Sequence, residues 1–412
     1  MSNKANTSER LGPAINLDAN ATYPMPQAIC SELRELISPL LNPSSIHSGG
    51  QLSRNLIEQS RESIAQLLSL SPSDRVIFTS GATESNNTVF NSAFSREQAA
   101  PASEHSAGCD CVISAIEHPS VISAARRLQA RGITVSVVRP EPAGGEFISN
   151  SFCAACGLST RLASVMLANN ETGQILPVSK ISNALKSAFP MILVHCDAVQ
   201  AIGKLPVAFN ELGVDMLSLS AHKLGGLAGI GALVLRGGIE LDPLIIGGPQ
   251  EQKRRGGTEN ILGIASFGIA ARFTKNQLAE RIACMRSAKA ALTHALLQNI
   301  EDLSLNFSHV DSLPNTLSLH IPGVLADDLV VALDLAGLYI SAGAACSSGK
   351  PEPSPVLLAM GLSEQAARET VRLSLHAEYA DGEIDRAADT IVRCIKRMRA
   401  NSASHALRAA NH

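Results

Sequence analysis

The sequence contains few aromatic residues and carries little net charge. It has no tryptophan, and Phe, Trp and Tyr together make up 3% of its 412 residues. Single-stranded nucleic acids are commonly bound on aromatic stacking platforms, and nucleic acids and anionic membranes attract proteins with a cationic excess. Because the formal net charge is -3, we expect neither a nucleic acid nor a membrane as a partner.

The chain also lacks a long, uninterrupted hydrophobic segment. Its most apolar stretch, residues 329–346, is broken by Asp334 and by two glycines, and it is too short for a comfortable membrane span. The first ten residues are polar and contain no apolar core of a secretory signal. Nine cysteines, an odd number spread over a long chain, argue against a secreted disulfide framework. We therefore expect a globular, cytoplasmic protein.

Between about residues 75 and 236, the sequence alternates short β-rich segments with helical patterns. Such alternation is typical of βαβ units and predicts a mainly parallel sheet. Helices are expected to begin near Gly81 and at Pro119, each shortly after a strand. Seven strands are expected, at residues 75–80, 111–116, 135–138, 163–168, 191–196, 215–220 and 231–235.

The pattern changes after about Ile261, where long helices begin to dominate. They are expected at residues 277–300, 326–336 and 382–399, with a strand at residues 316–321. We therefore expect a large α/β domain over residues 16–260, a smaller α+β domain over residues 261–400 and a frayed tail at residues 401–412. The N-terminal segment, residues 1–25, is expected to pack on the small domain.

Two short motifs, Asp197-Ala198-Val199-Gln200 and Ser220-Ala221-His222-Lys223, follow expected strands. A lysine such as Lys223 serves as the amine of a Schiff base when its surroundings lower its pKa. Asp197 ends a hydrophobic strand, where a carboxylate needs a partner such as a protonated pyridine nitrogen. Gln200 would bond the phenolic oxygen of the same ring. Each residue alone also fits an ordinary loop or helix cap, but together they favour pyridoxal phosphate.

A phosphate site and a ring-covering residue complete this set. Gly81, Ala82 and Thr83 form a helix start, where free N–H groups and the helix dipole attract phosphate. Ser220 and His222 would add further donors. His118 ends another strand at the edge where open α/β sheets bind ligands, so its imidazole would lie over the ring and move protons. A plain helix start or a capping histidine is the alternative for each residue taken singly.

A lone cysteine, Cys346, lies in the loop of small residues from Ser341 to Gly349. Such a loop has few anchoring side chains and is expected to swing, and a thiolate is a strong nucleophile. A small buried cysteine in a tight turn is the plainer alternative. Cys153 and Cys156 have redox or metal-ligand spacing, but one such pair without a second indicates neither function, and we expect no metal site.

From about Asn16 to Leu375 the sequence resembles one family, the class V, fold-type I pyridoxal-phosphate enzymes, and among them the cysteine desulfurases of the NifS and IscS kind. That resemblance implies a large domain with a seven-stranded, mainly parallel sheet and a smaller α+β C-terminal domain. The motifs that carry it are residues 17–22 (LDANAT), 42–47 (NPSSIH), 79–86 (TSGATESN), 117–118 (EH), 169–173 (NNETG), 197–200 (DAVQ), 220–223 (SAHK), 256–260 (GGTEN), the Cys346 loop and 371–374 (VRLS).

The resemblance also implies a role for each matching position. Lys223 would form the Schiff base, Asp197 would pair with the ring nitrogen, and His118 would stack on the ring as acid and base. Gln200 would bond the ring oxygen, and Arg372 would clamp the substrate carboxylate. Asn170 would lie beside both cofactor and substrate, and the phosphate would be held by Ala82, Thr83, Ser220 and His222. Thr258 would contact the phosphate of a neighbouring subunit, which implies a homodimer with shared active sites.

For the reaction, the resemblance implies removal of sulfur from L-cysteine, giving L-alanine and a persulfide on Cys346. The sulfur would pass to an acceptor protein, either an iron–sulfur scaffold or a thiolation enzyme. Lys223 and His118 are the expected proton carriers, and the steps are not divided between them. Three alternatives stay open: a selenocysteine lyase, a class V aminotransferase that does not need Cys346, and a non-catalytic sulfur-trafficking scaffold.

Overall fold

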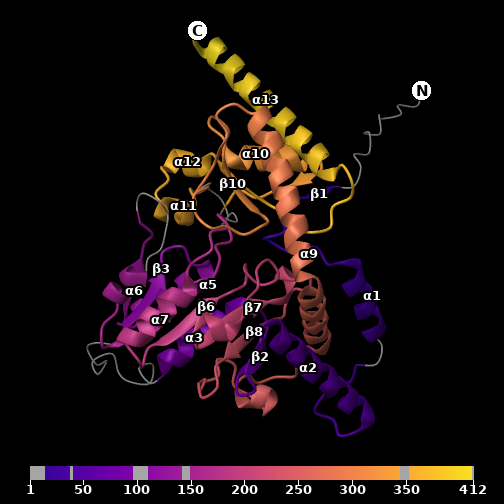
Figure 1. Cartoon of the computed structure of the whole chain (residues 1–412), viewed down its shortest axis with the longest axis vertical. Coiled ribbons are helices and arrows are strands. Elements are labelled where there is room, and N and C mark those ends of the chain that lie inside the picture. The colour runs from indigo at the N-terminus through magenta and orange to yellow at the C-terminus, as the bar shows by residue number, and fades with distance from the viewer. Residues whose placement is uncertain (1–13, 38–39, 96–109, 142–148, 344–351, 411–412) are drawn as a thin grey trace, which may run out of the picture.

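The computed structural model describes residues 14–37, 40–95, 110–141, 149–343 and 352–410, with side chains described as far as residue 401. Its α-helices (Figure 1) are α1 Gln27–Leu36, α2 Ser48–Leu67, α3 Ala82–Ala93, α5 Pro119–Gln129, α6 Ser149–Ala155, α7 Val178–Ala188, α8 Phe209–Leu212, α9 Ile261–Asn299, α10 Ala326–Asp334, α11 Pro355–Ala359, α12 Glu364–Arg368 and α13 Glu383–Ala410, with 3-10 helices η2 Ala221–Lys223 and η3 Gln250–Lys253. Its strands are β1 Ile15–Asn16, β2 Arg75–Thr79, β3 Asp110–Ser114, β4 Thr134–Val138, β5 Thr160–Ser164, β6 Leu193–Asp197, β7 Met216–Ser220, β8 Gly231–Leu235, β9 Ser304–Leu305, β10 Thr316–His320, β11 Leu338–Tyr339 and β12 Thr370–Ser374.

The largest sheet contains all seven expected strands in the order β2-β8-β7-β6-β5-β3-β4. Only β8 runs antiparallel to its neighbours, β2 and β7, so the predicted mainly parallel sheet is confirmed. β5 begins three residues earlier than the sequence predicted, at Thr160. The chain beyond β5 stays beside β6, because the N–H groups of Val165 and Leu167 donate to carbonyls of His195 and Asp197.

Helices cover both faces of this sheet. Along β2, Val76 and Phe78 pack in one core cluster with α2, α7 and the first half of α9, while Ile77 packs in another with α3 and α5. Successive side chains of a strand point to opposite faces, so a strand buried on both sides needs an unbroken apolar run. This burial explains why the sequence shows short continuous apolar segments there.

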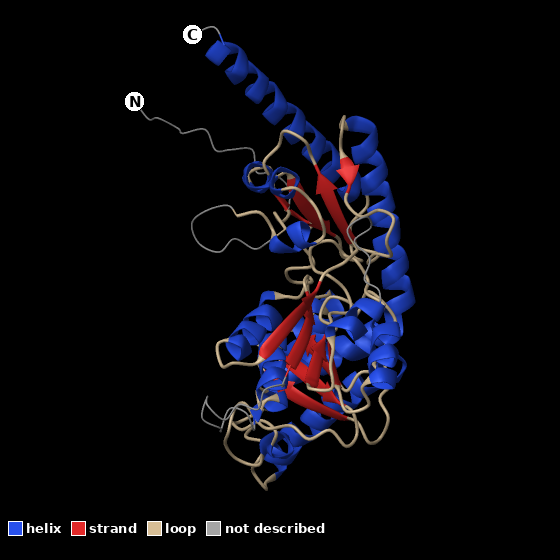
Figure 2. Ribbon diagram, turned by 90° about the vertical axis from the view of Figure 1, so that its left-hand side faces the viewer, coloured by secondary structure: helices blue, strands red, loops and turns tan. Residues whose placement is uncertain are grey.

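A second, smaller layer forms around the antiparallel sheet β12-β10-β9. Its core joins this sheet to α10, α13 and the end of α9, through residues that include Leu296, Leu317, Leu333 and Ile391. β1 pairs in parallel with β11, which places Ile15 and Asn16 against this layer. Figure 2 shows the two sheets in separate parts of the molecule, with a long helix beside both.

That long helix, α9, begins at Ile261, although its periodicity predicted a start at Gln277. Residues 263–271 are buried on every side, so they show no amphipathic stripe. At Gly268, a Cβ would lie 2.5 Å from the Cα of Ser60 in α2, so the close helix crossing requires glycine. The first half of α9 packs in the large core and its end in the small one. The domain division at residue 261 stays a prediction, and this packing favours a boundary inside α9.

The last helix also differs from its predicted extent. The sequence predicted an end near Arg399 and a frayed tail, whereas α13 extends to Ala410. Its final segment is rich in alanine, the residue with the highest helix propensity, which favours continuation of the helix. No helix in the described ranges combines the length and the apolar character that a bilayer crossing requires.

Candidate active site

A cavity of about 540 Å³ opens at the carboxyl ends of β6 and β7, within the size range of small-molecule sites. From the small layer, Arg372 of β12 and the segment at Ser341 and Gly343 also line it. Ten of the residues predicted from the sequence border this one space: Ala82, Thr83, His118, Asn170, Asp197, Gln200, Ser220, His222, Lys223 and Arg372.

Lys223 lies in η2, directly after β7. Its Nζ donates to the backbone carbonyl oxygens of Asn20, at 2.6 Å, and of Ala21, at 2.7 Å. Burial, followed by the cation of Arg372, lowers the pKa of Lys223 to about 8. A useful fraction of this amine is therefore deprotonated near neutral pH, which is the form that attacks an aldehyde.

Asp197 ends β6 and is 4% exposed. Its carboxylate accepts from the N–H of Val199 at 3.1 Å and from Nδ2 of Asn86 at 2.9 Å. Both donors are neutral groups, and Asp197 also lines the cavity. Nδ2 of Asn86 also donates to Oγ of Ser120, which in turn contacts Nδ1 of His118 at 2.8 Å. Asn86 and Ser120 thus link the predicted acid to the predicted ring-covering histidine.

His118 is the N-cap of α5, where its Nδ1 accepts from the N–H of Ser120 at 3.1 Å. This hydrogen bond places the proton of the neutral imidazole on Nε2. Desolvation, followed by the cation of Lys223, lowers the pKa of His118, while the charge of Asp197 opposes the shift. The ring is therefore neutral at pH 7, with Nε2–H as its remaining polar group.

The start of α3 supplies the anion-binding end of the cavity. Gly81 is its N-cap residue, and the N–H groups of Ala82 and Thr83 belong to the first turn, where no intrahelical acceptor exists. The start of β8 approaches closely, since a Cβ on Gly231 would lie 2.7 Å from the Cα of Gly81. Burial, then the cation of Lys223, lowers the pKa of His222 to about 4, so its imidazole is neutral. Free backbone donors and neutral side chains are suited to a phosphate.

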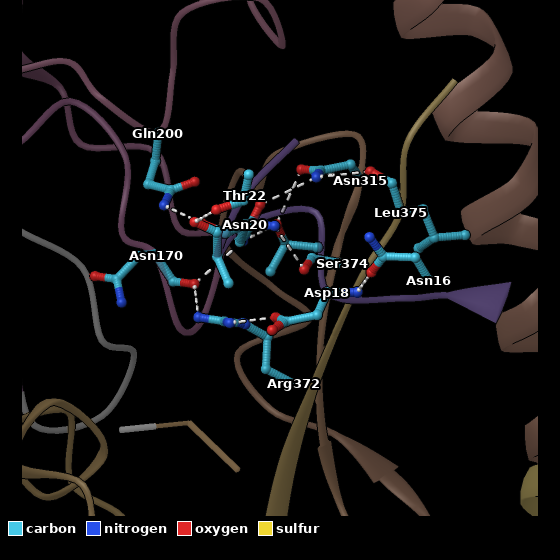
Figure 3. A network of polar contacts seen from close by, with 12 residues as sticks. Asn16, Asp18, Asn20, Thr22, Asn170, Gln200, Asn315, Arg372, Ser374 and Leu375 are labelled. Atoms are coloured by element: carbon cyan, nitrogen blue, oxygen red, sulfur yellow. Dashed lines mark hydrogen bonds and ion pairs between the residues drawn. The ribbon is translucent and has the colours of Figure 1, made fainter. Parts of the chain in front are cut away.

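Arg372 lines the cavity from the small layer, and Figure 3 shows its guanidinium in contact with Asp18 and Asn170. Its Nη2 forms an ion pair of 2.5 Å with Oδ1 of Asp18, and its Nη1 donates to the backbone oxygen of Asn170 at 3.0 Å. Nε is buried and has no hydrogen-bond partner in the described part of the chain. Asp18 belongs to a motif that the sequence singled out, but its role as the partner of Arg372 was not predicted.

Two buried carboxyl groups near the site were also missed. Glu117 accepts from Oγ of Ser114 at 2.5 Å and from the N–H of Met166 at 2.8 Å, and burial raises its pKa to about 8. Glu171 accepts from Oγ of Ser354 at 2.5 Å, and burial raises its pKa as well. Both glutamates stand in motifs that carried the resemblance. For Glu117, its place directly after the mainly apolar residues 112–116 was an available signal, whereas the polar motif around Glu171 gives none.

Thr258 is not among the described residues that line the cavity, and Cys346 is not described. Thr258 borders a smaller, neighbouring cavity of about 180 Å³, which shares only Ser80 and Gly229 with the main one. Its contact with the phosphate of another subunit stays a prediction. Cys346 lies outside the described residues, so its position stays a prediction too. Within the described ranges, no group of His, Cys, Asp and Glu is arranged to hold a metal ion, and Cys153 and Cys156 are free thiols.

The residues of the cavity fit pyridoxal phosphate. The cofactor requires an amine for its aldehyde, an anion for its ring nitrogen and an anion-binding helix start for its phosphate. Lys223 would supply the amine, and the buried carboxylate of Asp197, whose hydrogen-bond donors among the described residues are neutral, would supply the anion. The open N–H groups at the start of α3 supply the third requirement.

The chain is similar in sequence and in fold to known proteins. The family model described as aminotransferase class-V matches residues 15–387. The chain belongs to this family, whose members use pyridoxal phosphate, and it has the predicted fold-type I architecture. It is 36% identical to a protein named cysteine desulfurase from Gluconacetobacter diazotrophicus, over 94% of each chain. A solved structure titled NifS-like protein matches with a TM-score of 0.84 and 30% identity, over 93% of this chain and 99% of that one. Another, titled SspA in complex with cysteine, matches with a TM-score of 0.76 and 30% identity, over 89% and 100%.

Proposed function

We propose that the chain is a pyridoxal-phosphate-dependent cysteine desulfurase, which converts L-cysteine to L-alanine and carries the sulfur as a persulfide on Cys346. The observation that carries the proposal is the convergence of Lys223, Asp197 and Arg372 on one cavity. Family membership, a relative named cysteine desulfurase and a similar structure in complex with cysteine support the reaction class and the substrate.

In this proposal, Ala82, Thr83, Ser220 and His222 would hold the phosphate of the cofactor, and Asp197 would keep its ring nitrogen protonated. Gln200 would donate to its ring oxygen, and the imidazole of His118 would cover the ring. When bound, pyridoxal phosphate supplies an electron sink that stabilises negative charge developing on the substrate carbon.

Lys223 and His118 move the protons. The amine of Lys223, with a pKa of about 8, takes a proton from the substrate Cα when it is neutral and returns it when it is charged. His118 has its proton on Nε2 and is joined to Asp197 through Ser120 and Asn86. This link orients the imidazole, so that it exchanges protons at one fixed atom.

Arg372 recognises the carboxylate of the substrate. Its guanidinium is held on one side by Asp18 and on another by the backbone of Asn170, while Nε has no partner in the described residues. A carboxylate entering the cavity would take the free donor and compete with Asp18 for the others. Asn170 also lines the cavity and would complete the substrate contacts.

The thiolate of Cys346 attacks the sulfur of the substrate. A new S–S bond forms as the carbon–sulfur bond of the substrate breaks, and its electron pair stays with carbon, which is protonated and leaves as L-alanine. Gly343 lines the cavity, and three residues of chain reach at most about 11 Å, so covalent geometry permits Cys346 to reach this site.

Two partners belong to the proposal. A homodimer would bring Thr258 of one chain to the phosphate of the other, which is consistent with the position of Thr258 in a neighbouring cavity. An iron–sulfur scaffold or a thiolation enzyme would accept the sulfur from Cys346. The expected cytoplasmic location stays a prediction.

The products of cysteine turnover test the proposal. With a thiol reductant present, the protein should release L-alanine and sulfide in equal amounts, and Cys346→Ala should abolish both while the yellow absorbance of the bound cofactor persists. A keto acid in place of alanine would identify an aminotransferase instead. Turnover of selenocysteine that survives Cys346→Ala, without turnover of cysteine, would identify a selenocysteine lyase.

A further inference from the structure

Behind the cavity lies a lysine with no place in the proposed reaction. Lys204 follows the Asp197–Gln200 turn by four residues and is 1% exposed, among the largest fully buried side chains of the described residues. Its Nζ donates to Oδ1 of Asn20 at 2.8 Å and to Oε1 of Gln200 at 2.6 Å. Both of these residues line the cavity, whereas Lys204 itself does not.

The surroundings of Lys204 are unusual for a buried amine. Its two hydrogen-bond acceptors are uncharged amide oxygens. Burial, followed by the cations of Lys223, Arg372 and Arg281, lowers its pKa well below the ordinary range. Two N–H donors of Nζ are taken by these two acceptors. A buried lysine without an acidic partner is expensive, so a function in placing its acceptors is the natural explanation.

The contacts of Gln200 show what Lys204 determines. Oε1 of Gln200 accepts from Lys204, while Nε2 donates to the backbone oxygen of Asn20 at 3.0 Å. A flipped amide would place its NH2 group against the N–H donors of Lys204 and its oxygen against the carbonyl of Asn20. Both contacts would then be repulsive, so the pair fixes the amide in one orientation. Only the NH2 end of Gln200 can then present a second hydrogen to the cavity.

Lys204 acts on Asn20 in the same way. Asn20 joins several parts of the site (Figure 3): its Nδ2 donates to the backbone oxygen of Asn170 and to Oγ1 of Thr316, and its own backbone oxygen accepts from Nζ of Lys223 at 2.6 Å. The second acceptor position of Oδ1 is filled by Nδ2 of Asn315 at 3.1 Å. With Oδ1 bound to two donors, the Asn20 amide also has a single orientation.

We propose that Lys204 is a positioning residue of the active site, which locks the Gln200 amide so that its N–H, and never its oxygen, faces the ring oxygen of the cofactor. This inference rests on the proposed function, since it concerns the same bound group. Lys204 touches neither substrate nor cofactor and acts through Gln200, with Asn20 as the second residue that it holds.

A spectroscopic titration tests the proposal. A hydrogen bond from Gln200 favours the deprotonated ring oxygen, so loss of the lock should raise the pH at which the absorbance of bound pyridoxal phosphate titrates. For Lys204→Met, which keeps an unbranched side chain one atom shorter and removes its donors, we expect an upward shift of about one pH unit. Lys275→Met, which removes an exposed lysine of α9, should leave the titration unchanged.

A double-mutant cycle shows whether Lys204 acts through Gln200. Gln200→Leu should shift the titration by a similar amount, and Lys204→Met should add nothing further in that background. An unchanged titration in Lys204→Met, or a shift that adds fully to that of Gln200→Leu, overturns the proposal. Loss of packing alone would lower thermal stability without producing this pattern.

Two further measurements keep the test decisive. Lys204→Gln retains part of the donor set, so it should shift the titration upward by less than one pH unit. If Lys204→Met fails to fold, this variant still tests the proposal, because an unchanged titration in Lys204→Gln overturns it. The same double-mutant cycle, measured as thermal stability of the apo-protein, should show coupling between positions 200 and 204. If the two effects on stability are additive, the hydrogen bond between Lys204 and Gln200 is refuted. Failure of the wild-type protein to bind pyridoxal phosphate would instead refute the proposed function, while the apo-protein cycle still tests the contact.

Discussion

The two sides of the cavity are held in place by different kinds of contact. On the large-domain side, Lys223 and Asp197 follow directly from strands of one sheet, and His118 caps the helix after another. On the other side, Arg372 is joined to Asp18 across 354 residues of sequence, and Asn20 to Thr316 across 296. The sheet itself positions the residues of the first side. The residues of the second side are positioned by contacts between the N-terminal segment, at Asp18 and Asn20, and the small layer. Substitutions on the first side should therefore remove chemistry, and those on the second should weaken substrate binding or folding.

The largest effect is expected on the sheet side, at Lys223. Lys223→Ala removes the only amine that the proposed reaction uses, and we expect cysteine turnover to fall by about 10³-fold or more. Thermal stability should change little, because the catalytic chemistry and not the core is affected. Lys180→Ala, at an exposed lysine of α7, is the matched control. Turnover within tenfold of the wild type in Lys223→Ala would contradict the assignment.

The next effect is expected at the centre of the second side. Asn20→Ala removes a side-chain hydrogen-bond partner from Lys204, Asn315 and Thr316 within a buried network, which should lower the free energy of unfolding by about 2–4 kcal/mol. Denaturant unfolding of the apo-protein measures this loss. Asn299→Ala, at an exposed residue of α9, should change stability by less than about 0.5 kcal/mol. Equal effects of the two substitutions would show that Asn20 does not join the layers.

A smaller effect separates binding from chemistry at Arg372. Arg372→Lys keeps the charge and loses the forked donor geometry, so KM for cysteine should rise by about 30-fold with kcat changed far less. Steady-state kinetics give both constants. Arg393→Lys on α13 provides the control. A large fall in kcat at unchanged KM would assign Arg372 to the chemical step instead of to substrate binding.

The smallest effect concerns the protonation of Lys223. Because its pKa lies near 8, the reactive neutral fraction should increase about tenfold between about pH 7 and about pH 9. The rate at which the apo-protein takes up pyridoxal phosphate should follow the same curve. Lys289, in the middle of α9, also has a pKa lowered to about 8 by burial, so Lys289→Ala is a stringent control. If the midpoint moves in Lys289→Ala, the titration belongs to Lys289 and not to Lys223.

The sheet side was predictable from the sequence because its chemistry follows local patterns. Each of the seven strands is a short apolar run, and Asp197 and Lys223 come directly after two of them. The second side was not predictable in this detail. The pairing of Asp18 with Arg372 and the contacts of Asn20 join residues that are hundreds of positions apart, and no periodicity in either segment reports the partner.

Burial also concealed parts of the fold and of the site. The first turns of α9 are apolar on all sides, so their pattern gave no amphipathic signal and the helix was predicted to start too late. Lys204 was overlooked because a lysine normally indicates a solvated surface, whereas here it is fully buried between two amides. The place of Thr258 outside the main cavity could not be predicted from local sequence patterns, because its predicted contact is with the phosphate of a second subunit.

The central claim is that sulfur leaves the substrate on a thiol of this chain. The most direct measurement is the mass of the protein after one turnover of cysteine labelled with heavy sulfur, without reductant, followed by mapping of the modified peptide. The account predicts one added heavy sulfur atom on Cys346, one equivalent of alanine, and neither in Cys346→Ala. Alanine formed without any sulfur attached to Cys346 would contradict it.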